Sequence, residues 1–185
     1  AWRGASPSQL ILSQVGVHMS LVIRARTFAS AAHAAIAQQR KYTGEPYIMH
    51  PLRVVSLVSH VKHTEQMLAA AWLHDVVEDT PITLEHIEAE FGSAVFKLVE
   101  ELSDVDCEGN RAARKLVQLE RMRYASWQAQ TIKLADLIDN SQSIIKHDPA
   151  FAKVFVPEAR DLLAVMKSGD KSLWYQLGGI LEGSV

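Results

Sequence analysis

The fold is decided by residues 69–80, AAAWLHDVVEDT, in which an apolar beginning runs directly into one imidazole and three carboxylates. Alanine and leucine favour a helix, and the preceding residues 65–68, EQML, continue the same helical pattern. We therefore expect one continuous helix that Thr64 or a neighbour opens and that Thr80-Pro81 stops. Buried charges are costly unless they are paired or bound to a metal. The acidic end is thus either a solvated helix terminus or the place of a cation.

Helical spacing of apolar residues recurs along the rest of the chain, and the alternation typical of strands is nearly absent. Glycine and proline interrupt the pattern between helices. The sequence predicts helices at 21–39, 50–60, 64–79, 84–91, 93–102, 111–124, 127–147 and 157–168, and one short helix within the tail 169–185. Residues 1–18 lack such a pattern and precede Met19, so we interpret them as a non-native or disordered extension. We predict a single compact all-α domain over residues 19–185.

The composition of the chain excludes several classes of protein. The 185 residues are 48% hydrophobic and 22% charged, which is typical of a globular domain with a real core. The net charge of −2 predicts no affinity for nucleic acid or for an anionic membrane, and no apolar run approaches the roughly 18 residues that span a bilayer. The single cysteine, Cys107, excludes an internal disulfide and suits a reducing cytoplasm. The oligomeric state stays open, with a homodimer among the alternatives.

The acidic helix has the spacing of a metal site. Residues four apart share a helix face, so His74 lies beside Glu78 and Asp75 lies beside Asp79. His74 and Asp75 differ by about 100° around the helix, so both can reach one ion only near a helix end or groove. Carboxylates at a helix C-terminus meet the negative end of the helix dipole and repel one another. This placement favours a bound cation over a solvated acidic turn.

Two distant positions offer further ligands. His50 follows the rigid turn GEPYIM and begins a helix that should pack antiparallel to the acidic one, although an imidazole bonded to the backbone is an alternative there. Asp136 lies within an apolar helix, and Asn140 is on the same face four residues later. Two imidazoles and two carboxylates suit a divalent transition ion, with Mn²⁺, Fe²⁺ and Co²⁺ all open. The candidate ligands are therefore His50, His74, Asp75 and Asp136.

Three stretches together resemble a known family: AQQRKYTGEPYIMHPLRV at 37–54, LAAAWLHDVVEDT at 68–80 and IKLADLIDN at 132–140. The order His…His-Asp…Asp is that of the HD superfamily of metal-dependent phosphohydrolases. The chain is similar in particular to the hydrolase domain of RelA/SpoT proteins, over about residues 21–147. A synthetase domain would need a couple of hundred further residues, so we expect a stand-alone small alarmone hydrolase like the metazoan SpoT homologue.

The resemblance implies removal of the 3′-pyrophosphate from ppGpp or pppGpp, the alarmones of the stringent response, usually with one Mn²⁺. It makes His50, His74, Asp75 and Asp136 the metal ligands. It assigns Glu78 and Asp79 to water activation and proton transfer. It places Asn140 near the nucleotide and Arg40 and Lys41 against the substrate, while Tyr47 lines the nucleotide pocket or packs under its turn, with equal support.

The sequence departs from the pattern of the family at two positions near these residues. The family usually carries arginine where Lys41 stands, and it has a basic residue where KLADLIDN has Leu137. Lysine binds phosphate as a point charge, whereas arginine can stack on a base and form two parallel bonds. Two other functions therefore remain as alternatives. One is hydrolysis of another nucleotide, such as NADPH or a nucleoside phosphate, and the other is alarmone binding without turnover.

Overall fold

The computed structural model describes residues 19–104 and 110–183, so the expected extension at 1–18 and Cys107 lie outside the described residues. Every regular element in the described part is a helix, which confirms the all-α prediction. The helices are α2 (Leu21–Ala35), α3 (Met49–Ser59), α4 (Glu65–Leu73), α5 (Val76–Asp79), α6 (Leu84–Phe91), α7 (Ser93–Leu102), α8 (Arg111–Tyr124), α9 (Trp127–His147), α10 (Pro149–Val165) and α11 (Lys171–Glu182). None of these helices has the length and apolar character needed to cross a membrane.

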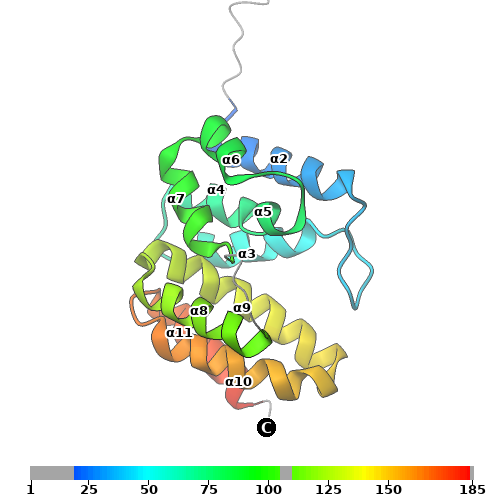
Figure 1. The fold of residues 1–185 in the computed structure, drawn as a ribbon, viewed down its shortest axis with the longest axis vertical. Helices are drawn as coiled ribbons and strands as arrows, with labels where there is room; N and C mark the ends of the chain where they lie inside the picture. The colour runs from blue at the N-terminus through cyan, green and yellow to red at the C-terminus, as the bar shows by residue number, and fades with distance from the viewer. Residues whose placement is uncertain (1–18, 105–109, 184–185) are drawn as a thin grey trace, which may run out of the picture.

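The helices form two groups with α3 between them (Figure 1). The upper group holds α2 and α4 to α7, and the lower group holds α8 to α11. Helix α3 packs against α4 of the upper group and against α9 of the lower group. Both partners are heavily buried, because α4 is covered by α2, α3 and α7, and α9 by α3, α7, α10 and α11. Side chains from α3, from the end of α4 and from the middle of α9 can therefore meet in the interior.

The expected continuous helix at 64–79 is wrong at one point, because it breaks between Leu73 and Val76. His74 keeps helical angles, but Asp75 has φ −98° and ψ −6°, which is the bridge region where many active-site residues lie. The apolar part of the segment is held in the core, whereas its acidic part must face a polar site. The break satisfies both demands and turns His74 and Asp75 toward the same point.

The first helix ends at Ala35 rather than at residue 39, because the chain turns sharply at Ala37 with φ 50°. The following loop folds back on itself: the amide of Arg40 donates to the carbonyl of Glu45 at 2.9 Å, and the amide of Gly44 donates to the carbonyl of Arg40 at 2.9 Å. Gly44 has φ 70°, which favours glycine at this turn. The loop places the side chain of Arg40 in the polar interior between the two groups of helices.

Helix α10 begins at Pro149 and not near residue 157 as the sequence predicted. Asp148 caps it, because its Oδ1 accepts a hydrogen bond from the amide of Phe151 at 3.0 Å, and Pro149 is suited to a first turn. Pro157 lies inside the helix but is exposed, so water can take over the hydrogen bond that the proline ring removes.

Gln130 links two turns of the lower group by hydrogen bonds. Its side chain is 1% exposed, and its Nε2 donates to the carbonyls of Met122 at 2.9 Å and Ala125 at 3.2 Å. Its Oε1 accepts from the amides of Ser168 at 2.8 Å and Gly169 at 3.0 Å. The turn between α8 and α9 is thereby joined to the turn between α10 and α11.

Replacing Gln130 by leucine is expected to lower the free energy of unfolding by about 2–4 kcal/mol, because buried backbone groups lose their partners. Urea denaturation measures this change. Gln176→Leu, at an exposed position on α11, serves as the control and should stay within about 0.5 kcal/mol of wild type. A Gln130 variant as stable as that control would contradict the role of this side chain.

Candidate metal centre and active site

The interior between α3, α4 and α9 holds a compact cluster of two imidazoles and a carboxylate. His50 comes from the first turn of α3, His74 follows α4, and Asp136 lies in the middle of α9. The two Nε2 atoms are 3.2 Å apart, and Oδ1 of Asp136 is 3.1 Å from Nε2 of His50 and 3.8 Å from Nε2 of His74. All three side chains are buried, and their nearest ligand atoms lie within 4.8 Å of one another.

Asp75 adds a fourth donor at the edge of this cluster. Its Oδ2 lies 3.2 Å from Nε2 of His74 and 3.4 Å from Nε2 of His50. The same oxygen accepts a hydrogen bond from the hydroxyl of Tyr47 at 2.6 Å. The side chain of Asp75 is 17% exposed, so it is less deeply buried than the other three groups, but it faces the same point as they do.

The donor set fits one divalent cation. Nδ1 of His74 faces the carbonyl of Ala71 at 2.9 Å, and Nδ1 of His50 faces Oδ2 of Asp139 at 2.6 Å. Since both partners are acceptors, each Nδ1 carries a hydrogen and each Nε2 is left to face the cluster. A separation of about 3 Å is what two nitrogens have when both bind one ion at about 2.1 Å. Mixed imidazole and carboxylate donors suit a divalent transition ion.

The HD domain family matches residues 25–166 of this chain. The chain belongs to this family. The match confirms the resemblance that the sequence motifs predicted, and it places the cluster and all of its helices within the shared region.

Curated relatives of this HD domain bear the name guanosine-3′,5′-bis(diphosphate) 3′-pyrophosphohydrolase. MESH1 of Xenopus tropicalis is 39% identical over 135 residues, which are 70% of this chain and 73% of that protein. MESH1 of Homo sapiens is 36% identical over 139 residues, which are 73% of this chain and 75% of that protein. A probable enzyme of the same name from Synechocystis is 36% identical over 150 residues, but the chain spans only 19% of its length.

Solved structures share the arrangement of helices. A metazoan orthologue of SpoT that hydrolyses ppGpp superimposes with a TM-score of 0.81 at 29% identity, covering 89% of this chain and 96% of that one. A protein from Listeria monocytogenes shares the fold with a TM-score of 0.65 at 24% identity, covering 77% of this chain and 99% of that one. The HD fold therefore extends over most of the chain, including helices of the tail beyond the motifs.

Charge in the HD cluster is arranged for a cation. Burial opposes ionisation of Asp136, but Lys133 and the two histidines outweigh it and hold the pKa of this carboxyl well below its usual range. Burial likewise opposes protonation of His74, yet Asp75 and Asp136 raise its pKa to about 9. The pKa of His50 is raised well above its usual value by carboxylates that also outweigh burial. Without an ion, protons on the imidazoles balance the carboxylates.

Metal binding is therefore expected to release at least one proton at pH 7, and the affinity for Mn²⁺ should rise between pH 6 and 9. Calorimetry in buffers of different ionisation enthalpy counts the released protons. A raised histidine pKa stabilises the fold below about 6.5 and loses this effect as pH rises toward 9. The metal-free protein should accordingly lose up to about 3 kcal/mol of stability over this window. A Mn²⁺ affinity independent of pH would contradict this charge arrangement.

Asp136 is held on both sides within the HD site. Its Oδ2 lies 2.8 Å from the ammonium of Lys133, and its Oδ1 accepts from Nδ2 of Asn140 at 2.6 Å. Sequence reasoning found Asn140 but missed Lys133 and Asp139. Both lie three residues from Asp136 on the same helix, so the spacing that identified Asn140 could also have identified them.

The two outer carboxylates lie one turn beyond the cluster, on α5. Glu78 is accessible to solvent at the mouth of the site and accepts a hydrogen bond from the amide of Asp104 at 2.7 Å. Partial desolvation in this recess raises its pKa to about 7, which suits a proton acceptor near neutral pH. Asp79 accepts from Nε2 of Gln38 at 2.9 Å, and Gln38 is held in turn by Nδ1 of His33 at 2.6 Å.

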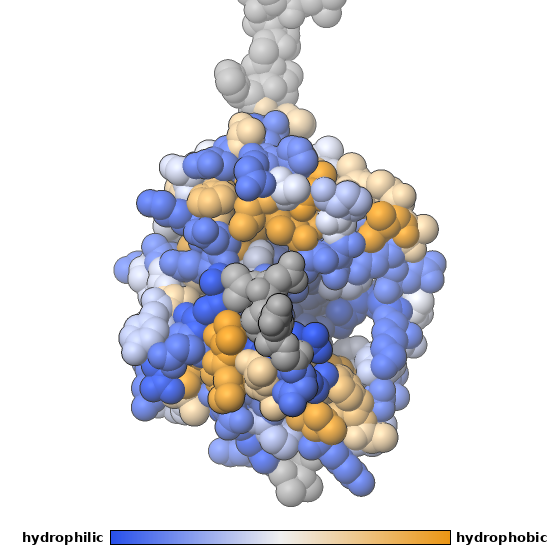
Figure 2. Space-filling model, viewed as in Figure 1, coloured by the Kyte–Doolittle hydropathy of each residue, from blue (hydrophilic) through white to orange (hydrophobic). Residues whose placement is uncertain are grey.

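The remaining predicted substrate residues divide between two places. Arg40 lies beside the cluster, because its Nη2 donates to Oδ1 of Asn140 at 3.0 Å and its guanidinium faces the Tyr47 ring at 5.9 Å. Lys41 turns outward, is 74% exposed and lies 3.6 Å from Asp148 at the start of α10. Tyr47 bonds to Asp75 and packs on the ring of His33, so it forms a wall of the site. A hollow rimmed by hydrophilic side chains opens between the two groups of helices (Figure 2).

Proposed function

We propose that this HD domain is a metal-dependent guanosine-3′,5′-bis(diphosphate) 3′-pyrophosphohydrolase, which converts ppGpp or pppGpp to GDP or GTP and pyrophosphate. The observation that carries the proposal is the convergence of His50, His74 and Asp136 in a buried cluster that fits one divalent ion. The MESH1 relatives, identical at 36–39% over about three quarters of their length, support the substrate.

The ion would be held by His50, His74, Asp75 and Asp136, whose mixed donors suit a divalent transition ion. Among such ions we propose Mn²⁺, the ion that the resemblance to RelA/SpoT hydrolases implies. A divalent ion at such a site lowers the pKa of water and takes up negative charge on a phosphoryl oxygen. Lys133 and Asn140 keep Asp136 ionised and correctly turned, since they contact its two oxygens separately.

The proposed hydrolysis requires a group that accepts a proton from water, and it breaks one bond between phosphorus and oxygen. Water attacks the phosphorus that is attached to the 3′ oxygen, the bond between them breaks, and pyrophosphate leaves while the 3′ oxygen regains a proton. Glu78 orients the water and accepts its proton, because its pKa of about 7 allows it to act near neutral pH. Asp79, which accepts a hydrogen bond from Gln38, is assigned to the onward transfer of this proton.

Arg40 is the better placed of the two basic residues for binding the outer phosphates. Its side chain is 13% exposed and contacts Asn140, whereas Lys41 is largely solvated. Arg40→Ala is expected to raise KM by about 10–100-fold, as the loss of a charge-assisted bond implies, and Lys41→Ala should have a smaller effect. Steady-state kinetics on both variants measures this difference, and a larger KM change for Lys41→Ala would contradict it.

A panel of nucleotides incubated with the protein and Mn²⁺ tests the proposed function, with products identified by chromatography. We expect ppGpp to give GDP and pyrophosphate, and a chelator to stop the reaction. Faster turnover of NADPH or of a nucleoside phosphate would replace the proposed substrate. Tight binding of ppGpp without turnover would instead support an alarmone-binding domain.

A further inference from the structure

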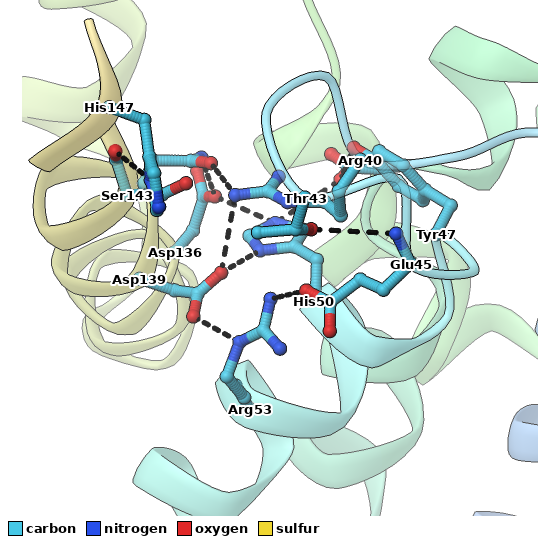
Figure 3. Close-up of polar contacts among 12 residues, drawn as sticks. Arg40, Thr43, Glu45, Tyr47, His50, Arg53, Asp136, Asp139, Ser143 and His147 are labelled. Atoms are coloured by element: carbon cyan, nitrogen blue, oxygen red, sulfur yellow. Dashed lines mark hydrogen bonds and ion pairs between the residues drawn. The ribbon is translucent and has the colours of Figure 1, made fainter.

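Asp139 lies behind His50, on the far side of the imidazole from the metal cluster (Figure 3). His50 is fully buried and uses both ring nitrogens. Its Nε2 faces Asp136 at 3.1 Å, and its Nδ1 donates to Oδ2 of Asp139 at 2.6 Å. The two nitrogens lie on different edges of the ring, so Asp139 reaches the cluster only through His50.

The two histidines of the cluster are oriented by different kinds of acceptor. Nδ1 of His74 donates to the carbonyl of Ala71, which belongs to the same helix and is fixed by it. Nδ1 of His50 donates to the side chain of Asp139, which comes from another helix 89 residues away. The orientation of His50 therefore depends on a carboxylate that must itself be held in place.

Arg53 and Glu45 hold this carboxylate. Nε of Arg53 donates to Oδ1 of Asp139 at 2.5 Å, and Nη2 of Arg53 donates to Glu45 at 2.9 Å. Nη2 of Arg40 lies 3.4 Å from the other oxygen of Asp139. Each oxygen of Asp139 thus has its own cationic neighbour, and Figure 3 shows the chain of contacts running from Glu45 through Arg53 and Asp139 to His50.

We propose that Asp139 is a positioning residue for the metal site and that Arg53 keeps it in place. This inference rests on the proposed metal-dependent function. The carboxylate fixes the hydrogen on Nδ1 of His50, directs Nε2 toward the cluster and makes that nitrogen a stronger donor. Partners of this kind, behind a metal-binding histidine, change metal affinity by about 10–100-fold when they are removed.

Calorimetric titration with Mn²⁺ at one pH tests the proposal. Asp139→Ala should bind Mn²⁺ about 10–100-fold more weakly than wild type. Arg53→Met should weaken binding by a smaller factor, since it acts through Asp139. Asp161→Asn, which removes an exposed carboxylate on α10, is the matched control and should bind as wild type does. Circular dichroism establishes that each variant is folded.

A charge-balanced variant separates orientation from simple attraction. Asp139→Leu combined with Arg53→Met removes one negative and one positive charge, so the net charge near the site stays as in the wild type. Weak Mn²⁺ binding by this double variant supports the proposal. Affinity restored to the wild-type value would overturn it, because net charge alone would then explain the single variant.

Nuclear magnetic resonance of the wild-type protein loaded with Zn²⁺ gives a second measurement that needs no variant. We expect the hydrogen of His50 on Nδ1, protected from exchange with solvent. A hydrogen on Nε2 would overturn the proposal even if every variant unfolded. Failure of the wild-type protein to bind Mn²⁺ would instead refute the proposed function. If the wild type binds Mn²⁺ and Asp139→Ala binds it with the same affinity, only this inference is refuted.

Discussion

Asp136→Asn is expected to lower kcat/KM for ppGpp by about 10³-fold or more, because the contribution of a bound ion to phosphoryl transfer amounts to several kcal/mol. Asp136 is the carboxylate of the buried cluster that it forms with His50 and His74, and its side chain is almost completely buried. The asparagine keeps the size of the side chain but removes the charge that faces both Nε2 atoms. Mn²⁺ titration should show the affinity falling together with the activity.

Asp136→Asn also removes the partner of Lys133, so a second substitution at Lys133 serves as the control. The ammonium of Lys133 lies 2.8 Å from Asp136 in the interior, and a buried charge that loses its partner costs about 3–5 kcal/mol of stability. Asp136→Asn combined with Lys133→Met removes both charges, so it should recover stability without recovering activity. Activity that returns with stability in this double variant would show that Asp136 serves the fold and not the ion.

Glu78→Gln is expected to lower kcat by about 10²–10⁴-fold, the usual contribution of a positioned proton acceptor, while Mn²⁺ affinity stays near the wild-type value. Glu78 lies one turn beyond Asp75 and is accessible to solvent, so glutamine should fit there without disturbing the fold. The pKa of Glu78 is about 7, and activity should rise with pH as this carboxyl ionises. A bound cation lowers the midpoint of this rise below 7, and Glu78→Gln should remove the rise.

The control for Glu78 is an exposed glutamate outside the site. Glu120→Gln on α8 changes the same functional group, 62% exposed, and should leave kcat and its pH profile unchanged. An unchanged kcat in Glu78→Gln would refute its role as proton acceptor. A larger loss in Asp79→Asn than in Glu78→Gln would exchange the roles of these two carboxylates.

Local sequence patterns determined the elements of the fold. Helices α8 and α9 have the bounds that apolar spacing predicts, and Gly92 separates α6 from α7 as expected. The tail also contains the one short helix that was predicted within it. These features follow from neighbours within a few residues, because capping, proline and helical periodicity act over one or two turns.

Spacing along single helices also indicated which polar residues belong together. The HD dipeptide, His50 and Asp136 were selected from their order and surroundings, and the structure brings all of them to one point. The same reasoning predicted that Arg40 and Lys41 both contact the substrate, but Arg40 lies beside the cluster and Lys41 is exposed to solvent. Adjacent residues in a loop can face opposite ways, and no periodic pattern states which one turns inward.

An all-α chain, its main helices and the identity of the polar residues around an HD motif could therefore be predicted from local patterns. The break of the acidic helix at His74 and Asp75, and the placement of Asp139 behind His50 with Arg53 behind it, became apparent only from the folded chain. The break depends on burial of α4 from three sides, and the contact between Asp139 and His50 joins residues 89 positions apart. Such features arise from the packing of whole helices against one another, which local propensity does not encode.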